Sequence, residues 1–351
     1  IVVAACVTAL LCLAALAMRS CSGGLGGSSS DKEYVSISRE NVTADRAAEL
    51  TRSSQTKGIY FHECAIAPEA LERLAQSETV QILSFSTCSG FETLEPLASM
   101  PHLRTLAVSS MEDVDLGTLL PSSAQELDTL ELENLRIAGG EEALGRFEGL
   151  ATLTLTPVEG VEDLSFLSSL PNLATLDLTG IDTSAVQSMR YMFAGLYAAE
   201  ELPTTALDTR SVTDFSNMFG GSRKVRRLDL SSFDTTSAKE MTTMLIGCSA
   251  LRELDLSSFD MRGVERNSAM FYGCDSLEEV ALGPNFAFNP GITTRNDLPD
   301  APADETHTGY WANAADDAQY FLAADLSASY DGETMAGTWV WEAYRSFPLA
   351  L

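Results

Sequence analysis

The chain has 351 residues, and 45% of them are hydrophobic, so it can bury a substantial core. Asp and Glu number 50 against 22 Lys and Arg, which gives a formal net charge of -28. This charge excludes binding to nucleic acid or to anionic membranes by electrostatic attraction, because both need a basic patch. The one basic cluster is too small for a nucleic-acid site. It consists of Arg223, Lys224, Arg226 and Arg227.

The N-terminal segment 1–18 is uncharged and almost wholly apolar. As a helix rising ~1.5 Å per residue it would reach about 27 Å, close to the thickness of the bilayer core. We interpret residues 1–18 as a signal-anchor helix, with a lipoprotein acylated at Cys21 and a cleaved secretory signal as the open alternatives. A Gly/Ser-rich linker and an N-terminal cap follow over residues 19–56. The Asn41–Thr43 segment, with Asp45 beyond it, predicts the start of a helix.

Internal repetition is the strongest signal in the sequence. Over residues 57–175 an apolar–x–apolar triplet recurs about every 23 residues. The later triplets follow a leucine three positions earlier, which is the L-x-x-L-x-L frame of leucine-rich repeats. Alternation within each triplet directs two side chains into a core and the middle one to solvent. The triplets begin at Ile59, Leu83, Leu106, Leu130, Leu153 and Leu176.

From Leu176 to residue 283 the period lengthens to about 26 residues. Each unit carries an Asp after its strand and an apolar pair further on, and the spacing of apolar residues predicts one short helical face turned inward. Pro203 has no N–H to donate, so we expect a local flaw in the sheet there. The strand starts are Leu176, Leu202, Leu228, Leu254 and Val280, and the apolar pairs are Met192–Phe193, Met218–Phe219, Met244–Leu245 and Met270–Phe271.

These longer units resemble the repeats of the BspA-type leucine-rich-repeat surface proteins of bacteria. The resemblance is carried by LDLSSFD at 228–234 and 254–260 and by Gly-Cys at 247–248 and 273–274. The first-half repeats resemble those of internalin-like surface proteins. The resemblance implies a bacterial cell-surface protein for adhesion or host interaction, and it brings no catalytic residue.

Together these patterns predict an α/β repeat fold, a leucine-rich-repeat solenoid with a parallel β-sheet on one face. Residues 284–351 are interpreted as a small C-terminal cap, because a solenoid needs its open end covered. The aromatic residues of this tail would close the core, and a carbohydrate-binding module is the alternative. They are Tyr310, Trp311, Tyr330, Trp339 and Trp341.

Two sets of recurring polar residues have structural interpretations. Cys64 and Cys88, and Cys248 and Cys274, occupy equivalent slots in successive repeats and predict stacked buried thiols rather than disulfides. The recurring aspartates predict turns or helix caps that accept backbone N–H groups, with a calcium site as the alternative. They are Asp182, Asp208, Asp234 and Asp260. No catalytic motif is present, so neither catalytic residues, a metal nor a cofactor is expected.

A binding function should lie on the outward-facing strand positions, which are Thr-rich in the first half and acidic in the second. Asp229 and Asp255 are predicted to stack as like charges, which costs stability. That cost suggests a partner for the open face, although a merely solvated face is the alternative. The candidate binding residues are Asp177, Glu201, Arg227, Asp229, Glu253, Asp255 and Glu279.

We therefore expect a non-catalytic binding or adhesion protein on the extracellular side of the cell membrane, anchored by its N-terminus. Its partner would be an extracellular or host macromolecule, most readily a protein, and not nucleic acid. Membrane contact would involve the N-terminal segment only, and the sequence leaves the oligomeric state open. The alternatives are a structural cell-envelope spacer or self-association module, carbohydrate binding by the tail, and an enzyme with a pocket around residues 304–342.

Overall fold

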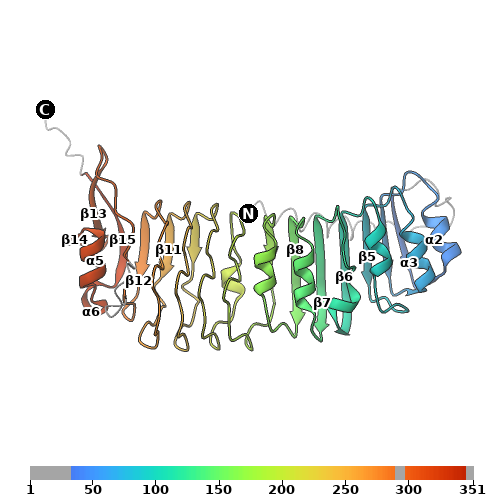
Figure 1. Ribbon diagram of the computed structural model, residues 1–351, viewed down its shortest axis with the longest axis horizontal. Coiled ribbons are helices and arrows are strands. Elements are labelled where there is room, and N and C mark those ends of the chain that lie inside the picture. Colours follow the sequence, from blue (N-terminus) through green and yellow to red (C-terminus); the bar gives the residue numbers. More distant parts are fainter. Residues whose placement is uncertain (1–32, 289–296, 345–351) are drawn as a thin grey trace. The chain divides into compact units, whose positions relative to one another are not determined.

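The computed structural model describes residues 33–288 and 297–344, and these divide into two compact units between Arg136 and Ile137. Within each unit the coils follow one another in chain order, and every coil except the one around Leu202 has a strand on one side and a return segment of turns or a short helix on the other (Figure 1). The apolar segment 1–18 lies outside the described residues. Among the residues that are described, no helix combines the length and apolarity needed to cross a bilayer.

The first unit contains a sheet that begins one coil earlier than the sequence predicted. β1 pairs in parallel with β3, with Val35 beside Ile59 and Ile37 beside Phe61. This coil has the inward alternation but no leucine frame, so the repeat pattern predicts a first strand only at Ile59. The strands, in hydrogen-bonded order, are β1 (Tyr34–Ser38), β3 (Gly58–His62), β5 (Ile82–Ser86), β6 (Thr105–Val114) and β7 (Thr129–Ile137).

The return segments of the first unit are short helices and one pair of very short strands. The predicted helix start is confirmed, because the Thr43 hydroxyl accepts the Arg46 N–H at 3.3 Å and caps α2. These elements are β2 (Asn41–Val42), α2 (Ala44–Leu50), β4 (Ala65–Ile66), α3 (Pro68–Leu74), η2 (Glu95–Ser99) and α4 (Leu116–Leu119). The buried faces of α2 and α3 pack against each other and cover the coils behind them.

The second unit carries two separate runs of parallel strands, and the break falls where Pro203 predicted a flaw. No strand forms at residues 201–203, and the chain makes the one-turn helix η5 (Thr204–Ala206) instead. The strands are β8 (Thr152–Glu159) and β9 (Thr175–Asp177), then β10 (Arg227–Asp229), β11 (Glu253–Leu256) and β12 (Glu279–Leu282); the short helices η3 (Glu141–Arg146) and η4 (Ser165–Ser169) precede the break.

The Met/Phe segments of the longer coils, from Leu176 onward, are buried as predicted, but the predicted helical face is wrong. Their N–H groups donate to carbonyls of the next coil, from Met189 to Asp214 at 2.9 Å and from Phe215 to Glu240 at 2.8 Å. One non-glycine residue per coil adopts a left-handed backbone conformation, which stops a helix from propagating. These residues are Tyr191, Asn217, Thr243 and Ala269, with φ between 55 and 60°. The coils are thus joined by a second ladder along their return segments.

Buried threonines join the same coils in the interior. The Thr235 hydroxyl, 1% exposed, donates to the Asp260 carbonyl at 3.2 Å and accepts the Asp260 N–H at 2.7 Å. Thr209 makes the same two bonds with Asp234. Each hydroxyl therefore satisfies two backbone groups of the following coil, which would otherwise be buried without partners.

The four cysteines that the structure describes, Cys64, Cys88, Cys248 and Cys274, are free and buried, as predicted. The Cys248 thiol donates to the Phe219 carbonyl at 3.1 Å, and Cys274 donates to the Leu245 carbonyl at 3.2 Å. Each thiol thus bonds to the preceding coil and not to the other sulfur. Gly273 precedes the second of them with a φ of 79°, and a Cβ there would lie 3.2 Å from the Gly247 Cα, so glycine is required for the coils to stack.

We expect Cys248 and Cys274 to resist alkylation in the native protein. Burial raises the pKa of Cys248 to about 12 and that of Cys274 well above its usual value. At pH 8 only about one Cys248 thiol in ten thousand is then the reactive thiolate. Mass spectrometry after iodoacetamide treatment should find both unmodified, whereas the same treatment in guanidinium chloride should modify both. Rapid labelling of the native chain, or a disulfide between the two, would contradict the packing described.

The tail adds three strands to the sheet of the last coils. β15 (Gly337–Ala343) pairs antiparallel with β12, which places Trp339 beside Val280, and β13 (His307–Asn313) and β14 (Asp316–Phe321) follow outward. The short helices α5 (Ala323–Ser329) and α6 (Gly332–Met335) complete this region. Trp311 and Trp339 are fully buried. The tail therefore occupies the edge of β12 and buries two tryptophans, while Tyr310, Tyr320 and Tyr344 remain exposed.

Candidate binding surface

The strands of the second unit bring three predicted binding residues into one row. Arg227, Glu253 and Glu279 are direct neighbours on β10, β11 and β12, because the parallel register advances by one whole unit from strand to strand. The Arg227 guanidinium lies 3.5 Å from the Glu253 carboxylate. Glu279 is exposed, and its carboxylate makes no hydrogen bond or ion pair with any other described residue. This row is open to a partner.

A second row contains the stacked aspartates, and the structure gives them a local role. Asp229 lies beside Asp255, as predicted. The Asp229 carboxylate accepts the Ser231 N–H at 3.1 Å and its hydroxyl at 2.6 Å, and these bonds, with Arg227 nearby, lower the pKa of Asp229. Asp255 accepts the Ser257 N–H at 2.8 Å. These turn-closing bonds offset the like-charge repulsion without any partner.

The same turn occurs at other aspartates of the second unit. Asp177 accepts the Thr179 N–H at 2.9 Å, so this predicted binding residue also closes a turn after its strand. The recurring aspartates of the return side each accept the N–H two residues on, which confirms the predicted turns. They are Asp182, Asp208, Asp234 and Asp260. Among the described residues, no group of three or more His, Cys, Asp or Glu could hold a metal ion.

A groove of about 440 Å³ opens where the strand at 201–203 is missing. It brings Glu201 together with Arg227 and Asp229, whereas Asp177 does not line it. The Thr204 hydroxyl donates to the Asp229 carbonyl at 2.9 Å and ties the irregular coil to β10. The groove is lined by Glu200, Glu201, Leu202, Thr204, Thr205, Arg226, Arg227 and Asp229. Charges of both signs therefore meet at the break in the sheet.

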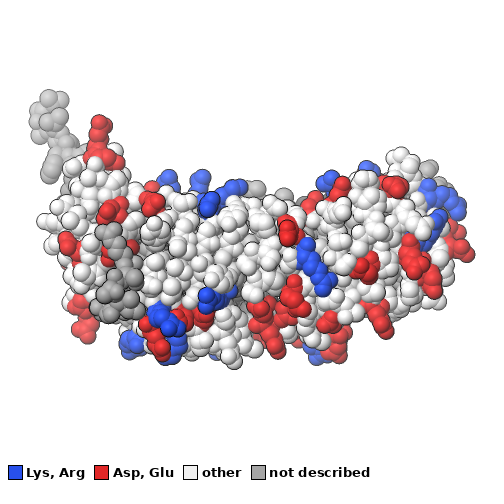
Figure 2. Space-filling view, viewed as in Figure 1, with Lys and Arg blue, Asp and Glu red and all other residues white. Residues whose placement is uncertain are grey.

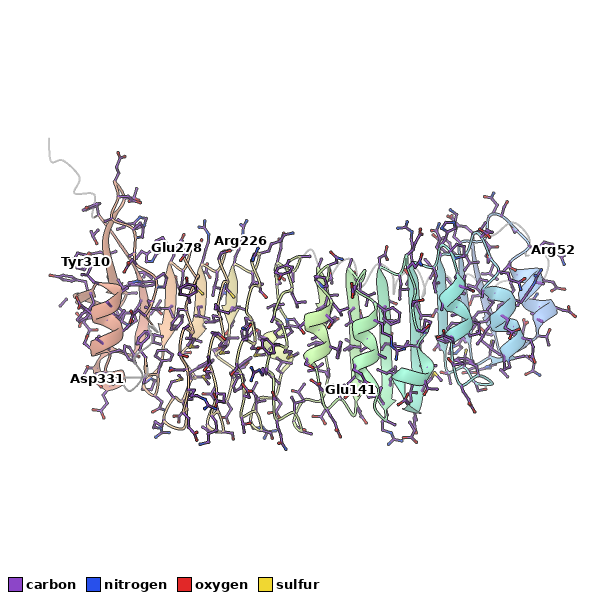
Figure 3. The ribbon with its side chains drawn as sticks, viewed as in Figure 1. Arg52, Glu141, Arg226, Glu278, Tyr310 and Asp331 are labelled. Atoms are coloured by element: carbon purple, nitrogen blue, oxygen red, sulfur yellow. The ribbon has the colours of Figure 1, made fainter. Side chains whose placement is uncertain are left out.

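Charged pairs also lie at the start of the strands. Figure 3 shows Arg226 and Glu278 at the same end of β10 and β12. Arg252 lies in the coil between them, and its guanidinium is 3.0 Å from the Glu278 carboxylate. On the face of the second unit seen in Figure 2, charged side chains gather along the upper and lower edges, and much of the band between them is uncharged.

The first unit contains a groove that the sequence patterns did not predict. It has a volume of about 170 Å³ and lies on the strand face. The middle residues of the apolar triplets on β5 and β6 are Ser84 and Ala107, whose small side chains leave a low floor between Tyr60 on β3 and Glu131 on β7. The lining also includes Ile82, Ser86, Thr105, Val108, Ser109 and Glu133. We call it the Tyr60–Glu131 groove.

The groove contains acidic groups without basic ones. Its lining has no Lys, Arg or His. Glu131 is half-buried, and burial, with the nearby charge of Glu133, raises the pKa of its carboxyl. Burial, followed by Tyr34 and Glu131, likewise raises the pKa of the Tyr60 hydroxyl. The Glu131 carboxylate makes no hydrogen bond or ion pair with any other residue that the structure describes.

A third cavity, of about 610 Å³, lies beside the first coil of the return-side ladder. Glu162, Asp163 and Ser165 line one part of it, and Arg190 and Tyr191 line another. The Arg190 guanidinium stacks over the Tyr191 ring at 5.0 Å and lies 3.7 Å from Asp214. The guanidinium of this cavity is thus already partnered within the protein.

Comparisons with known proteins give one family model and several solved structures. A family model described as "Mycoplasma protein of unknown function, DUF285" matches residues 164–282. A search of curated proteins found no match. The repeats have the leucine-rich-repeat fold, since the frame leucines Leu127, Leu130 and Leu132 are buried and the strands run parallel in register.

Several solved structures of leucine-rich-repeat proteins are similar to the chain. TLR13 in its complex with ssRNA13 has 17% identity and a TM-score of 0.44, and the match covers 73% of this chain and 36% of TLR13. An internalin from Listeria monocytogenes has 15% identity and a TM-score of 0.35, covering 66% and 69%. A leucine-rich-repeat protein of Leptospira interrogans has 13% identity and a TM-score of 0.39, covering 67% and 68%. The chain thus spans little more than a third of the TLR13 chain.

Proposed function

We propose that the protein binds a protein partner through the strand faces of its coils, without catalysis. The observation that carries the proposal is the division of the acidic residues. The turn-forming aspartates are occupied by backbone N–H groups, whereas Glu131 and Glu279 lie on the strand face with no partner among the described residues. Charged side chains that serve no structural bond, displayed on an open sheet, are suited to recognition.

In the second unit, we assign the recognition to Glu201, Arg227, Glu253 and Glu279. The aspartate carboxylates would not contact the partner directly, because each already accepts the backbone N–H two residues on and closes a turn at the end of its strand. These residues are Asp177, Asp229 and Asp255. The groove at the missing strand adds a recess beside this row. A basic segment of a partner fits the surface best, since three of these four side chains are acidic.

The proposed setting is the outside of a bacterial cell, with an extracellular or host protein as the partner. The support is the BspA-type resemblance of residues 176–283 and the apolar segment 1–18, which would serve as the anchor. Residues 284–351 would cap the solenoid, which fits the pairing of β15 with β12. The repeats would hold the binding face away from the membrane.

A charge-reversal experiment tests the strand face. The variant Glu253→Lys/Glu279→Lys changes the row, and Glu265→Lys/Asp275→Lys makes the same charge change at exposed return-side positions. Purified full-length proteins are titrated against immobilised extracellular-matrix and host-surface proteins. We expect the strand-face variant to lose at least about tenfold in affinity for any protein that binds the wild type, because two ion pairs become repulsive.

The return-side variant is the control and should bind like the wild type. Equal loss in both variants would show that overall charge governs binding, and an undiminished strand-face variant would clear this face of involvement. Thermal unfolding of each variant, followed by circular dichroism, checks that both remain folded.

A further inference from the structure

The Tyr60–Glu131 groove has the shape of a slot for one long side chain. Its floor is low because Ser84 and Ala107 are small, and Tyr60 and Glu131 stand on either side of it. The register places Tyr60, Ser84 and Ala107 in one row across β3, β5 and β6. Its volume of about 170 Å³ is far below the ≈ 300–1,000 Å³ of small-molecule sites.

The groove also has no positive charge to balance its carboxylates. Glu131 is half-buried, and Glu133 adds a second acidic group to the lining. A carboxylate removed from water normally has a cation or several hydrogen-bond donors beside it. Here the lining offers hydroxyl groups but no Lys, Arg or His, and Glu131 bonds to none of the described residues. A neutral sugar or an apolar chain would desolvate Glu131 further without neutralising it.

We infer that the Tyr60–Glu131 groove receives a lysine or arginine side chain of a partner protein. Its cationic group pairs with Glu131, and its alkyl chain lies over Ala107 against the ring of Tyr60. An aromatic face and a carboxylate together are the chemistry that recognises such a side chain. A bare metal ion fits less well, because no group of three or more ligating side chains occurs among the described residues. This inference rests on the proposed function and names the chemistry of one contact.

Peptide pools provide the probe. Heptapeptides are randomised at six positions, without Lys, Arg, Asp or Glu, and carry Lys, Arg, acetyl-lysine or norleucine at the centre. Fluorescence anisotropy measures their binding to the full-length protein. We expect the Lys and Arg pools to bind at least about tenfold more tightly than the acetyl-lysine and norleucine pools, as for a charge-assisted hydrogen bond in a partly desolvated site.

The variant Glu131→Gln preserves the size of the side chain and should abolish the preference. Glu78→Gln removes the same charge at an exposed position of the same unit, outside the groove, and should keep it. Tyr60→Ser should reduce the preference by a few fold, because the aromatic wall is lost. Equal binding of all four pools, or an equal effect of Glu131→Gln and Glu78→Gln, would overturn the inference.

The two proposals fail in different ways. If a protein partner loses affinity with Glu253→Lys/Glu279→Lys but binds Glu131→Gln like the wild type, the strand-face function holds and the groove inference is wrong. If neither variant affects any partner, the strand-face function fails as well.

Discussion

Replacing Trp339 with alanine should lower the free energy of unfolding by about 3–5 kcal/mol, as expected for truncating a fully buried tryptophan. Trp339 has no exposed surface, lies beside Val280 on β12, and donates its indole N–H to the Met335 carbonyl at 3.1 Å. The change removes the ring from the core and leaves that carbonyl without its donor. Denaturation in guanidinium chloride, followed by circular dichroism, measures the loss.

Tyr320→Ala is the matched control in the same tail. Tyr320 is 53% exposed, so its removal should cost well under about 1 kcal/mol. Similar losses from the two variants would show that the tail does not pack on the last coil as described. β15 covers the edge of β12. If the loss of Trp339 loosens β15, that edge becomes exposed and can pair with another copy of the chain. We therefore also expect Trp339→Ala to form oligomers in sedimentation experiments.

Replacing Thr235 with valine should lower the free energy of unfolding by about 2–6 kcal/mol, although it creates almost no cavity. The hydroxyl bonds to both the N–H and the carbonyl of Asp260, and valine leaves two buried backbone groups unpaired at about 1–3 kcal/mol each. Thermal and chemical denaturation measure the change.

Two further variants separate the hydroxyl from the rest of the side chain. Thr235→Ser keeps both hydrogen bonds and should retain most of the stability. Thr205→Val alters an exposed threonine in the preceding part of the unit and should be nearly neutral. If Thr235→Val were as stable as the wild type, the backbone of the next coil would not depend on this hydroxyl.

The repeat frame predicted the inward residues well, because a period-two strand leaves a clear pattern of buried positions. Leu106 and Val108 are buried as expected, and Pro203 interrupts the sheet as expected. The Met/Phe segments were misread because spacing at i, i+3 and i+4 reports which residues are buried, not the backbone that buries them. The left-handed residues that prevent a helix there, such as Tyr191 and Thr243, are not glycines, so the sequence does not reveal their backbone conformation.

The positions of the candidate binding residues in the fold were predicted in part, and their role in binding stays a prediction. A constant unit length is enough to place Arg227, Glu253 and Glu279 in one row. The turn-closing roles of the paired aspartates depend on which backbone N–H each carboxylate reaches, which spacing alone does not specify. The Tyr60–Glu131 groove was missed because it is defined by small residues. The signal was present in the middle positions of successive triplets, where Ser84 and Ala107 separate Tyr60 from Glu131.

The coil around Leu202 differs from its neighbours in how it is attached. It has lost its strand pairing but keeps the return-side bonds, with Met189 donating to Asp214 and Phe215 donating to Glu240. On the strand side the Thr204 side chain bonds to β10 in place of a backbone ladder. Under tension along the chain, a coil without that ladder opens at a lower force than a coil with backbone ladders on both sides. In a protein tethered at one end and attached to its target at the other, this coil would unfold first under load, and the other coils would stay folded.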